Sequence, residues 1–332
     1  MTELDVSLPV AAQPSLEDVV SLAEAAEDHG YDRVWLPETW GRDGVTTLAL
    51  AAERTDDVGL GASILNVYSR SPTLVGQTAA TLQEASDGRF RVGLGPSGPA
   101  VIRNWHGVEF DRPLKRTREY VEILRRVVSG EEVRYDGDVF RLGGFRLRQG
   151  PPEIPPPVDA AGMGPKSVEL AGRFADGWHA LMLTPEGLQD RLDDFRRGAD
   201  LGDRDPEDAR VTMSLTCYVD EDGDRAREQV RQHLCFYIGG MGTFYRDALA
   251  RQGYEDTAHA VYDNWNDGDR RAAMGALGDD LLGDLAVAGT PDEARERLAE
   301  FAGIDGVDAL TVGFPREADR EGIRTTMEVL AP

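Results

Sequence analysis

The sequence predicts an α/β fold, a TIM-like (β/α)8 barrel with insertions, that spans residues 1–332 as one domain. Three observations lead to this prediction. Short apolar β-type runs alternate with helical patterns, which calls for parallel strands joined by right-handed crossovers. About eight such strands lie outside a predicted hairpin, and eight strands close a barrel. A chain of 332 residues, 41% of them hydrophobic, can fill the core of one large barrel.

The first half of the chain follows the strand, loop, helix order closely. Ser15 caps a first helix that stops at Gly30, and its apolar residues recur at helical spacing. A polar loop at 37–44 follows the second strand, and a loop at 95–99, too rich in glycine and proline for regular structure, follows the fourth. The predicted strands are 4–10, 31–36, 58–65 and 90–94, and the helices after the second and third are 46–54 and 72–83.

The second half contains two predicted insertions. A hairpin around Asp136-Gly137 lies in an insertion near 131–150, and a stiff proline-rich linker at 151–157 follows it. Residues 238–284 mix Gly, Tyr, Trp and Asp irregularly and are predicted as an irregular insertion. The remaining strands are predicted at 158–161, 177–183, 211–219 and 309–312, and the helices at 112–128, 164–174, 185–201, 225–236, 291–301 and 320–330.

The charge of the chain is strongly negative. There are 60 acidic and 36 basic residues, and only Lys115 and Lys166 are lysine. At molar salt the repulsion among surface carboxylates is screened, so this composition is typical of a halophile, with an ordinary acidic enzyme as the alternative. Nucleic-acid binding is disfavoured because no basic face is visible.

Other features of the sequence concern its compartment. No run approaches the length of a membrane span, and the acidic start lacks the basic region of a secretion signal. We therefore expect a cytoplasmic protein without membrane contact. Cys217 and Cys235 have no metal-like spacing and are expected to be buried free thiols.

The residues that follow the predicted strands should gather at one face of the barrel. This set contains no paired histidines at metal-ligand spacing, no nucleophile elbow and no phosphate loop of the Gly-Lys type. Few ionisable groups and many exposed backbone groups suit a bound cofactor that carries the redox chemistry. The set comprises Glu38, Thr39, Ser63 to Tyr68, Gly95 to Gly98, Gly162 to Ser167, His179 and Phe314.

The segment from Ala161 to Ser167 is a candidate phosphate site. Pro165 suits the first position of a helix, and the glycines before it leave backbone amides open at the helix N-terminus. Lys166 would add a positive charge. The alternative is a tight turn into an ordinary helix with an exposed lysine.

Six stretches, in order along nearly the whole chain, resemble the bacterial-luciferase-like superfamily. Within it they look most like the branch that uses the deazaflavin coenzyme F420, which includes methylenetetrahydromethanopterin reductase. The stretches are Trp35-Leu36-Pro37-Glu38-Thr39-Trp40, Gly61-Ala62-Ser63-Ile64-Leu65-Asn66 with Arg70-Ser71-Pro72, Gly88-Arg89-Phe90-Arg91-Val92-Gly93-Leu94-Gly95, Ala160-Ala161-Gly162-Met163-Gly164-Pro165, Asp176-Gly177-Trp178 and Gly289-Thr290-Pro291.

The resemblance implies a barrel, commonly a homodimer, that binds F420 or FMN at the strand C-termini. In F420-using relatives the position matching Ser63-Ile64 carries a non-prolyl cis peptide against the deazaflavin ring. The carry-over makes Ser63, Ile64 and Asn66 the back wall for the ring. It gives the coenzyme phosphate to Met163, Gly164, Lys166 and Ser167, with Glu38, Gly95 and Gly162 also among the cofactor-binding residues.

The sequence departs from the family at positions that bear on catalysis. Several F420 dehydrogenases carry Asp-His after the second strand, where this chain has Glu38 and Thr39. Both are the predicted catalytic residues, although Thr39 cannot replace a histidine at neutral pH. No glutamate follows the fourth strand, which favours a hydride transfer that needs no strong base. No metal ligand is predicted.

The predicted function is therefore an F420-dependent oxidoreductase that moves a hydride between the deazaflavin C5 and a small organic substrate. The substrate classes considered are an iminium or methylene-pterin-like compound, an enone and a carbonyl. The alternatives are an FMN-dependent luciferase-like monooxygenase and a non-catalytic deazaflavin-binding protein.

The histidines and one tyrosine receive weaker predictions. His106 and His179 are placed to reach the barrel mouth, and Tyr68 directly follows the proposed bulge. His29 suits the C-terminus of the first helix, whereas His233 and His259 are predicted at the surface.

Overall fold

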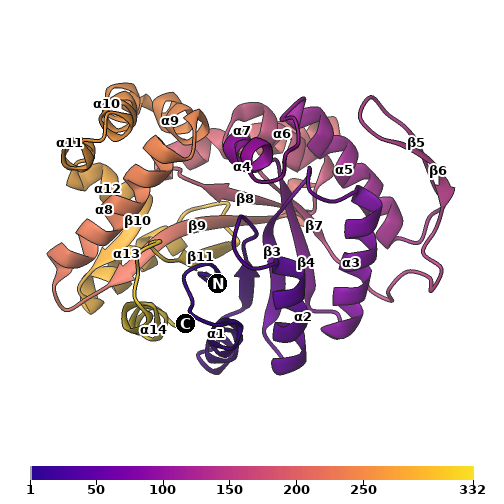
Figure 1. The fold of residues 1–332 in the computed structure, drawn as a ribbon, viewed down its shortest axis with the longest axis horizontal. Helices are drawn as coiled ribbons and strands as arrows, with labels where there is room; N and C mark the ends of the chain where they lie inside the picture. Colours follow the sequence, from indigo (N-terminus) through magenta and orange to yellow (C-terminus); the bar gives the residue numbers. More distant parts are fainter. Residues whose placement is uncertain (1) are drawn as a thin grey trace.

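The computed structural model describes residues 2–332 and confirms the TIM-like barrel (Figure 1). Within those residues eight parallel strands form a closed ring, because β9 pairs with β8 on one side and with β11 on the other. The ring order is β9, β11, β1, β2, β3, β4, β7, β8. Its strands are β1 (Glu3–Ser7), β2 (Arg33–Leu36), β3 (Gly59–Asn66), β4 (Phe90–Gly95), β7 (Val158–Ala161), β8 (Gly177–Leu181), β9 (Arg210–Val219) and β11 (Ala309–Gly313).

Helices cover the outside of the ring and begin where the sequence supplies caps. Ser15, Asp43, Ser71 and Thr184 each accept a backbone N–H in the first turn of the helix that follows. The predicted helices are confirmed with small shifts at their ends. They are α1 (Leu16–Asp28), α2 (Gly44–Arg54), α3 (Pro72–Ala85), α5 (Pro113–Val128), α6 (Pro165–Phe174), α7 (Pro185–Leu201), α8 (Gly223–Gly240), α13 (Pro291–Ala302) and α14 (Arg320–Val329).

The predicted hairpin is present as β5 (Val133–Asp136) and β6 (Arg141–Phe145), which pair antiparallel. Figure 1 shows it at the right edge, away from the barrel. Glu119 on α5 fixes the turn of the hairpin. Its carboxylate accepts the N–H groups of Asp138, Val139 and Phe140 at 2.9 to 3.0 Å.

The prediction of an irregular segment at 238–284 is wrong, because most of this segment is helical. It contains α9 (Thr243–Leu249), η2 (Ala250–Tyr254), α10 (Glu255–Asn266), α11 (Arg270–Ala276) and α12 (Asp279–Leu285), grouped at the upper left of Figure 1. Ala258 and Val261 are the buried residues of α10. The helices here are short, and Gly253, with φ of 90°, interrupts the helical spacing of the apolar residues, so the sequence pattern does not reveal them.

Three smaller elements also differ from the prediction. The first strand ends at Ser7 instead of residue 10. The short helix α4 (Pro99–Asn104) follows the glycine and proline loop, and β10 (Ala286–Gly289) extends the sheet by pairing with the end of β9. β10 is stabilised by its pairing with β9. A run of only four residues does not reveal such a pairing in the sequence.

The interior of the barrel holds large and charged side chains beside glycines. A Cβ on Gly61 would lie 2.2 Å from Cζ3 of Trp35, so only glycine leaves room for that indole ring. Trp35 is fully buried, and its Nε1 donates to Asp5 Oδ2 at 2.7 Å. Cys217 and Cys235 are buried and free, as predicted.

Candidate functional site

The carboxyl end of β3 carries a bulge at the mouth of the barrel. Ser63 and Ile64 are partly exposed, whereas the residues at 59–62 and 65–68 are buried. The peptide bond between Ser63 and Ile64 is cis, as the resemblance implies, and the pairing of β3 with β4 shifts in register between Ala62 and Leu65. Ser63 and Ile64 are therefore the part of β3 that can meet a ligand.

Small residues on the next strands make room for this bulge. A Cβ on Gly95 would lie 3.3 Å from Cγ1 of Ile64, and Ala161 also lies next to this position. A Cβ on Gly93 would lie 2.5 Å from the carbonyl oxygen of Ala62. A larger residue at 93 or 95 would therefore push on the bulge, and the predicted site residues Ser63, Ile64 and Gly95 do come together.

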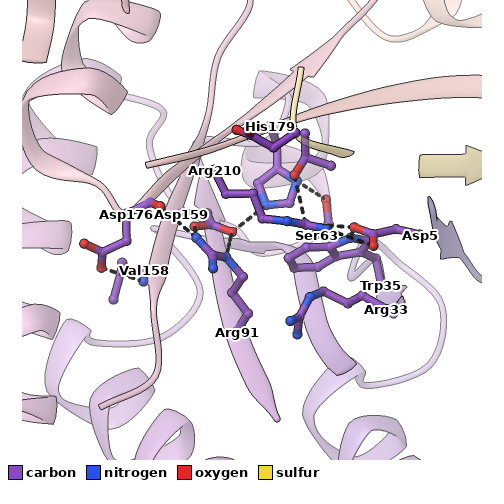
Figure 2. Close-up of polar contacts among 12 residues, drawn as sticks. Asp5, Arg33, Trp35, Ser63, Arg91, Val158, Asp159, Asp176, His179 and Arg210 are labelled. Atoms are coloured by element: carbon purple, nitrogen blue, oxygen red, sulfur yellow. Dashed lines mark hydrogen bonds and ion pairs between the residues drawn. The ribbon is translucent and has the colours of Figure 1, made fainter. Parts of the chain in front are cut away.

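A buried histidine supports Ser63 from inside the barrel (Figure 2). His179 Nδ1 lies 3.4 Å from Ser63 Oγ, and its Nε2 lies 3.2 Å from Asp159 Oδ2. An ionised carboxylate only accepts hydrogen bonds, so Nε2 carries the proton and, in the neutral ring, Nδ1 accepts from the Ser63 hydroxyl. The ring also stands edge-on to Trp35, with centroids 4.5 Å apart. These contacts fix the orientation of His179.

Asp159 is held in turn by Arg91. Arg91 Nε donates to Asp159 Oδ2 at 2.6 Å and Nη2 donates to Oδ1 at 2.8 Å. Burial alone would raise the pKa of Asp159, but the Arg91 charge and the hydrogen bond from His179 hold that pKa below its ordinary value. Asp159 is thus a buried carboxylate that stays ionised at neutral pH.

Sequence reasoning named His179 but missed Asp159 and Arg91. A signal was present, because each is a charged residue inside an otherwise apolar strand, β7 or β4. In a parallel barrel every second side chain points inward. A charge at such a position must find a partner across the interior.

The side chain of Asn66 serves the loop after β3. Its Oδ1 accepts the N–H groups of Tyr68 at 3.0 Å and Ser69 at 2.8 Å, and Asn66 is buried. Its Nδ2 lies 3.4 Å from His106 Nε2, which brings the predicted His106 to the same mouth. The Tyr68 hydroxyl donates to the carbonyl oxygen of Asp111 at 2.9 Å. The Asn66 side chain therefore holds the exit from the bulge.

Glu38 and Thr39 lie on the loop after β2, but their settings differ. Arg70 grips both carboxylate oxygens of Glu38 and also donates to Asp43 Oδ2 at 2.6 Å. The hydrogen bond to Glu38 raises the pKa of Arg70. Thr39 is exposed. Glu38 thus joins the loops after β2 and β3 through an ion pair.

The predicted anion segment lies at the N-terminus of α6, after β7. Ser167 Oγ accepts the Gly164 N–H at 3.1 Å and donates to the Gly164 carbonyl oxygen at 2.8 Å. Trp178 Nε1 donates to the carbonyl oxygen of Gly162 at 2.8 Å. Gly162, Met163 and Gly164 are all partly exposed. The side chains of Ser167 and Trp178 therefore fix the shape of this turn.

The positive charges near this turn come from two sources. Lys166 is exposed, and its Nζ donates to both oxygens of Glu169 at 3.1 Å. Arg251, on η2, places Nη1 3.8 Å from where a Cβ on Gly164 would lie, and in residues 2–332 it has no carboxylate within 4.0 Å. Sequence reasoning missed Arg251, because the segment that carries it was not predicted as helical.

The donors at this face suit an anionic, flat coenzyme. The amides at the start of α6 and the guanidinium of Arg251 are the donor types that bind phosphate. The partly exposed bulge at Ser63 and Ile64 offers an uncharged surface beside them. The residues present therefore fit F420, and they also fit FMN, which shares a tricyclic ring and a phosphate.

The partner of His233, a histidine predicted at the surface, could not be predicted from the sequence. His233 is only partly exposed, and its Nδ1 accepts the backbone N–H of Arg316 at 2.9 Å. Burial, together with the nearby charge of Arg316, lowers the pKa of His233 to about 4. The helical pattern of α8 gave no sign of this contact, which is made 83 residues further along the chain. His259 is exposed and His29 caps α1, both as predicted.

Comparisons with known proteins agree with the sequence resemblance. The sequence profile of a family described as Luciferase-like monooxygenase matches residues 2–307. A protein of Mycobacterium tuberculosis, provisionally named a coenzyme F420-dependent oxidoreductase, is 33% identical over 313 residues, which cover 88% of this chain and 90% of that protein. The 5,10-methylenetetrahydromethanopterin reductase of Methanolobus tindarius is 29% identical over 315 residues, which cover 94% of each chain.

Solved structures show the same fold. The coenzyme F420 dependent tetrahydromethanopterin reductase from Methanopyrus kandleri superposes with a TM-score of 0.85 at 23% identity, covering 99% of this chain and 97% of that one. In the described residues 2–332, none of the helices has the length and hydrophobicity that crossing a bilayer requires.

Proposed function

Because this chain belongs to the luciferase-like monooxygenase family, we propose that it is an F420-dependent oxidoreductase. It would move a hydride between the deazaflavin C5 and a small organic substrate. The observation that carries the proposal is the bulge of Ser63 and Ile64, which is partly exposed at the barrel mouth between buried neighbours. The names of the relatives from Mycobacterium tuberculosis and Methanolobus tindarius support an oxidoreductase of this kind.

The ring of the coenzyme would rest on Ser63 and Ile64. When bound, F420 supplies a two-electron hydride carrier. The protein supplies a fixed surface, because the Ile64 side chain lies against Gly95, Ala161 borders the same position, and His179 contacts the Ser63 hydroxyl. Asn66 acts indirectly in this proposal, by fixing the loop that follows the bulge.

The phosphate of the coenzyme would lie at the N-terminus of α6. Gly162, Met163 and Gly164 form the partly exposed turn, and Ser167 shapes it through its bonds to Gly164. Lys166 is the predicted charge here, and Arg251 is a second cation that has no carboxylate partner in residues 2–332. Backbone amides and cations at a helix N-terminus favour a bound anion.

The catalytic roles of Glu38 and Thr39 stay predictions. Glu38 would serve as an acid or base only when Arg70 yields one of its hydrogen bonds, since both carboxylate oxygens are engaged. A reaction without a strong base therefore suits this site best. Reduction of an iminium or methylene-pterin-like compound, or of an enone, meets that condition more readily than oxidation of an alcohol does.

Two other functions are distinguished by simple assays. An FMN-dependent monooxygenase would retain FMN tightly and consume oxygen when NAD(P)H is supplied. A non-catalytic deazaflavin-binding protein would bind F420 yet never oxidise its reduced form above background with iminium, enone or carbonyl substrates. The homodimer, the cytoplasmic location and the halophilic origin likewise stay predictions.

A glycine substitution tests the ring site. In Gly95→Val the new side chain would displace Ile64, so we expect F420 affinity to fall about tenfold or more. Gly143→Val is the matched control, because no atom lies within 4 Å of a Cβ at that position on β6. Equal F420 affinity in the two variants, both folded by circular dichroism, would overturn the placement of the ring.

A further inference from the structure

A cavity lies at the opposite end of the barrel from the bulge. Its volume is about 780 Å³, within the range of small-molecule sites. It opens where β4, β7, β8 and β9 begin, and Arg91, Asp176 and Arg210, drawn in Figure 2, line its inner side. The C-terminal ends of α5 and α6 and the proline segment before β7 form the outer walls.

The lining of this cavity is unusually rich in arginine for so acidic a chain. Six arginines line it beside four acidic residues, whereas the whole chain has 36 basic and 60 acidic residues. Arg125 and Arg204 share one carboxylate, that of Asp176. Burial, and then the nearby charge of Arg125, lower the pKa of Arg204. Positive charge is therefore only partly compensated here.

Two further arginines of the cavity have no counter-charge. In residues 2–332, no carboxylate lies within 4.0 Å of Arg126 or Arg173. Arg173 lies over the ring of its neighbour Phe174, with Cζ 5.1 Å from the centroid, and Arg126 donates to the carbonyl oxygen of Arg134 at 3.4 Å. Both side chains are exposed, so both can turn toward an anion.

The acidic members of the lining are mostly engaged elsewhere. The Tyr135 hydroxyl donates to Glu122, and the Ser129 hydroxyl donates to Glu131 at 3.3 Å. Asp176 pairs with Arg125 and Arg204, and Asp208 ends the short helix η1 (Pro206–Asp208) in the lining. None of these groups neutralises Arg126 or Arg173.

The cavity also has a rigid apolar wall. Pro155, Pro156 and Pro157 lie beside Phe174 and Val128 in the lining. Proline fixes its own φ angle, so this wall is formed before any ligand arrives. A ligand that suits both walls carries a phosphate group on a flat or apolar body.

We propose that this cavity binds an organic phosphate of nucleotide size. Its phosphates would pair with Arg126 and Arg173, whose planar guanidinium groups offer two parallel donors to phosphate oxygens. Its ring would pack on the prolines and Phe174. The site is separate from the bulge at Ser63 and Ile64 and does not depend on which coenzyme binds there.

Calorimetric titration of the full chain without coenzyme tests this proposal. ADP, pyrophosphate and adenosine are the ligands, at the lowest salt that keeps the protein folded, because chloride screens the arginines. We expect ADP to bind at one site per chain, pyrophosphate to bind more weakly and adenosine not to bind. Absence of ADP binding at millimolar concentration would overturn the proposal, and equal binding of pyrophosphate and ADP would overturn the role of the apolar wall.

A pair of variants locates the site. Arg126→Gln with Arg173→Gln should weaken ADP binding about tenfold or more, because two charge-assisted contacts are lost. Arg324→Gln is the control, since Arg324 is an exposed arginine on α14 outside the cavity lining. Thermal unfolding verifies that both proteins are folded. The same loss in the control, or no loss in the double variant, would show that ADP binds elsewhere.

Discussion

Replacing Asp159 with asparagine should destabilise the barrel strongly. Asparagine keeps the shape of the side chain but removes the charge that Arg91 contacts at 2.6 and 2.8 Å. Asp159 is 1% exposed, and the side chain of Arg91 is 12% exposed. Breaking a buried ion pair by removing one partner costs about 3–5 kcal/mol. The bond from Arg91 Nη2 to the carbonyl oxygen of Asp176, at 2.7 Å, remains and places the expected loss toward the lower end.

The same substitution should change how stability depends on pH. The pKa of Asp159 is below 3.8 in the folded protein, so its stabilising contribution is complete above the unfolded-state pKa near 3.8. That contribution is lost as the pH falls through the lower folded-state pKa. Asp159→Asn should therefore lose less stability than the wild type below about pH 4.

Urea unfolding in molar salt, followed by circular dichroism at pH 7 and at about pH 3, below the unfolded-state pKa of Asp159, measures both effects. Asp193→Asn is the matched control, because its side chain is 77% exposed and pairs with Arg196 at 3.0 Å. A surface pair of this kind contributes about 0–1 kcal/mol. If the free energies of unfolding of the two variants agree within about 1 kcal/mol at pH 7, the account of the barrel interior is refuted.

Two further predictions concern Glu38 and His233. Glu38→Gln should lower kcat about 100-fold if Glu38 is the acid or base. A kcat within about threefold of wild type in steady-state assays would leave Glu38 only its ion pair with Arg70. His233→Gln should remove a loss of stability between pH 6.5 and about 4, because the unfolded chain protonates this residue before the folded one does. In the wild type this loss of unfolding free energy should reach about 3 kcal/mol, measured by urea unfolding. The same pH dependence in His233→Gln as in the wild type would contradict the prediction.

Much of the fold follows from local sequence signals. The capping residue Ser15 and the apolar strand runs marked helices and strands of the barrel to within a few residues. β10 was not predicted, because four residues are too few to show a strand pattern. The helices from α9 to α12 were not predicted, because they are short and the turn at Gly253 interrupts the helical spacing of their apolar residues.

The positions of the site that directly follow a strand could be predicted from the sequence. The side chains that depend on a contact with a distant residue could not. Ser63, Ile64 and Gly95 follow strands directly, and the topology alone gathers such positions at one face. His179 and Glu38 have partners on other strands and loops. These partners are Asp159 for His179 and Arg70 for Glu38. No local pattern predicts which charges will meet across a barrel interior.

The choice of coenzyme tests the central claim most directly. The protein, purified in high salt, would be titrated with F420 and with FMN, and binding followed by the fluorescence of each coenzyme. The account predicts saturable binding of F420 without comparable binding of FMN, and turnover of reduced F420 with an iminium or enone acceptor. Tight retention of FMN, with oxygen consumption driven by NAD(P)H, would contradict it.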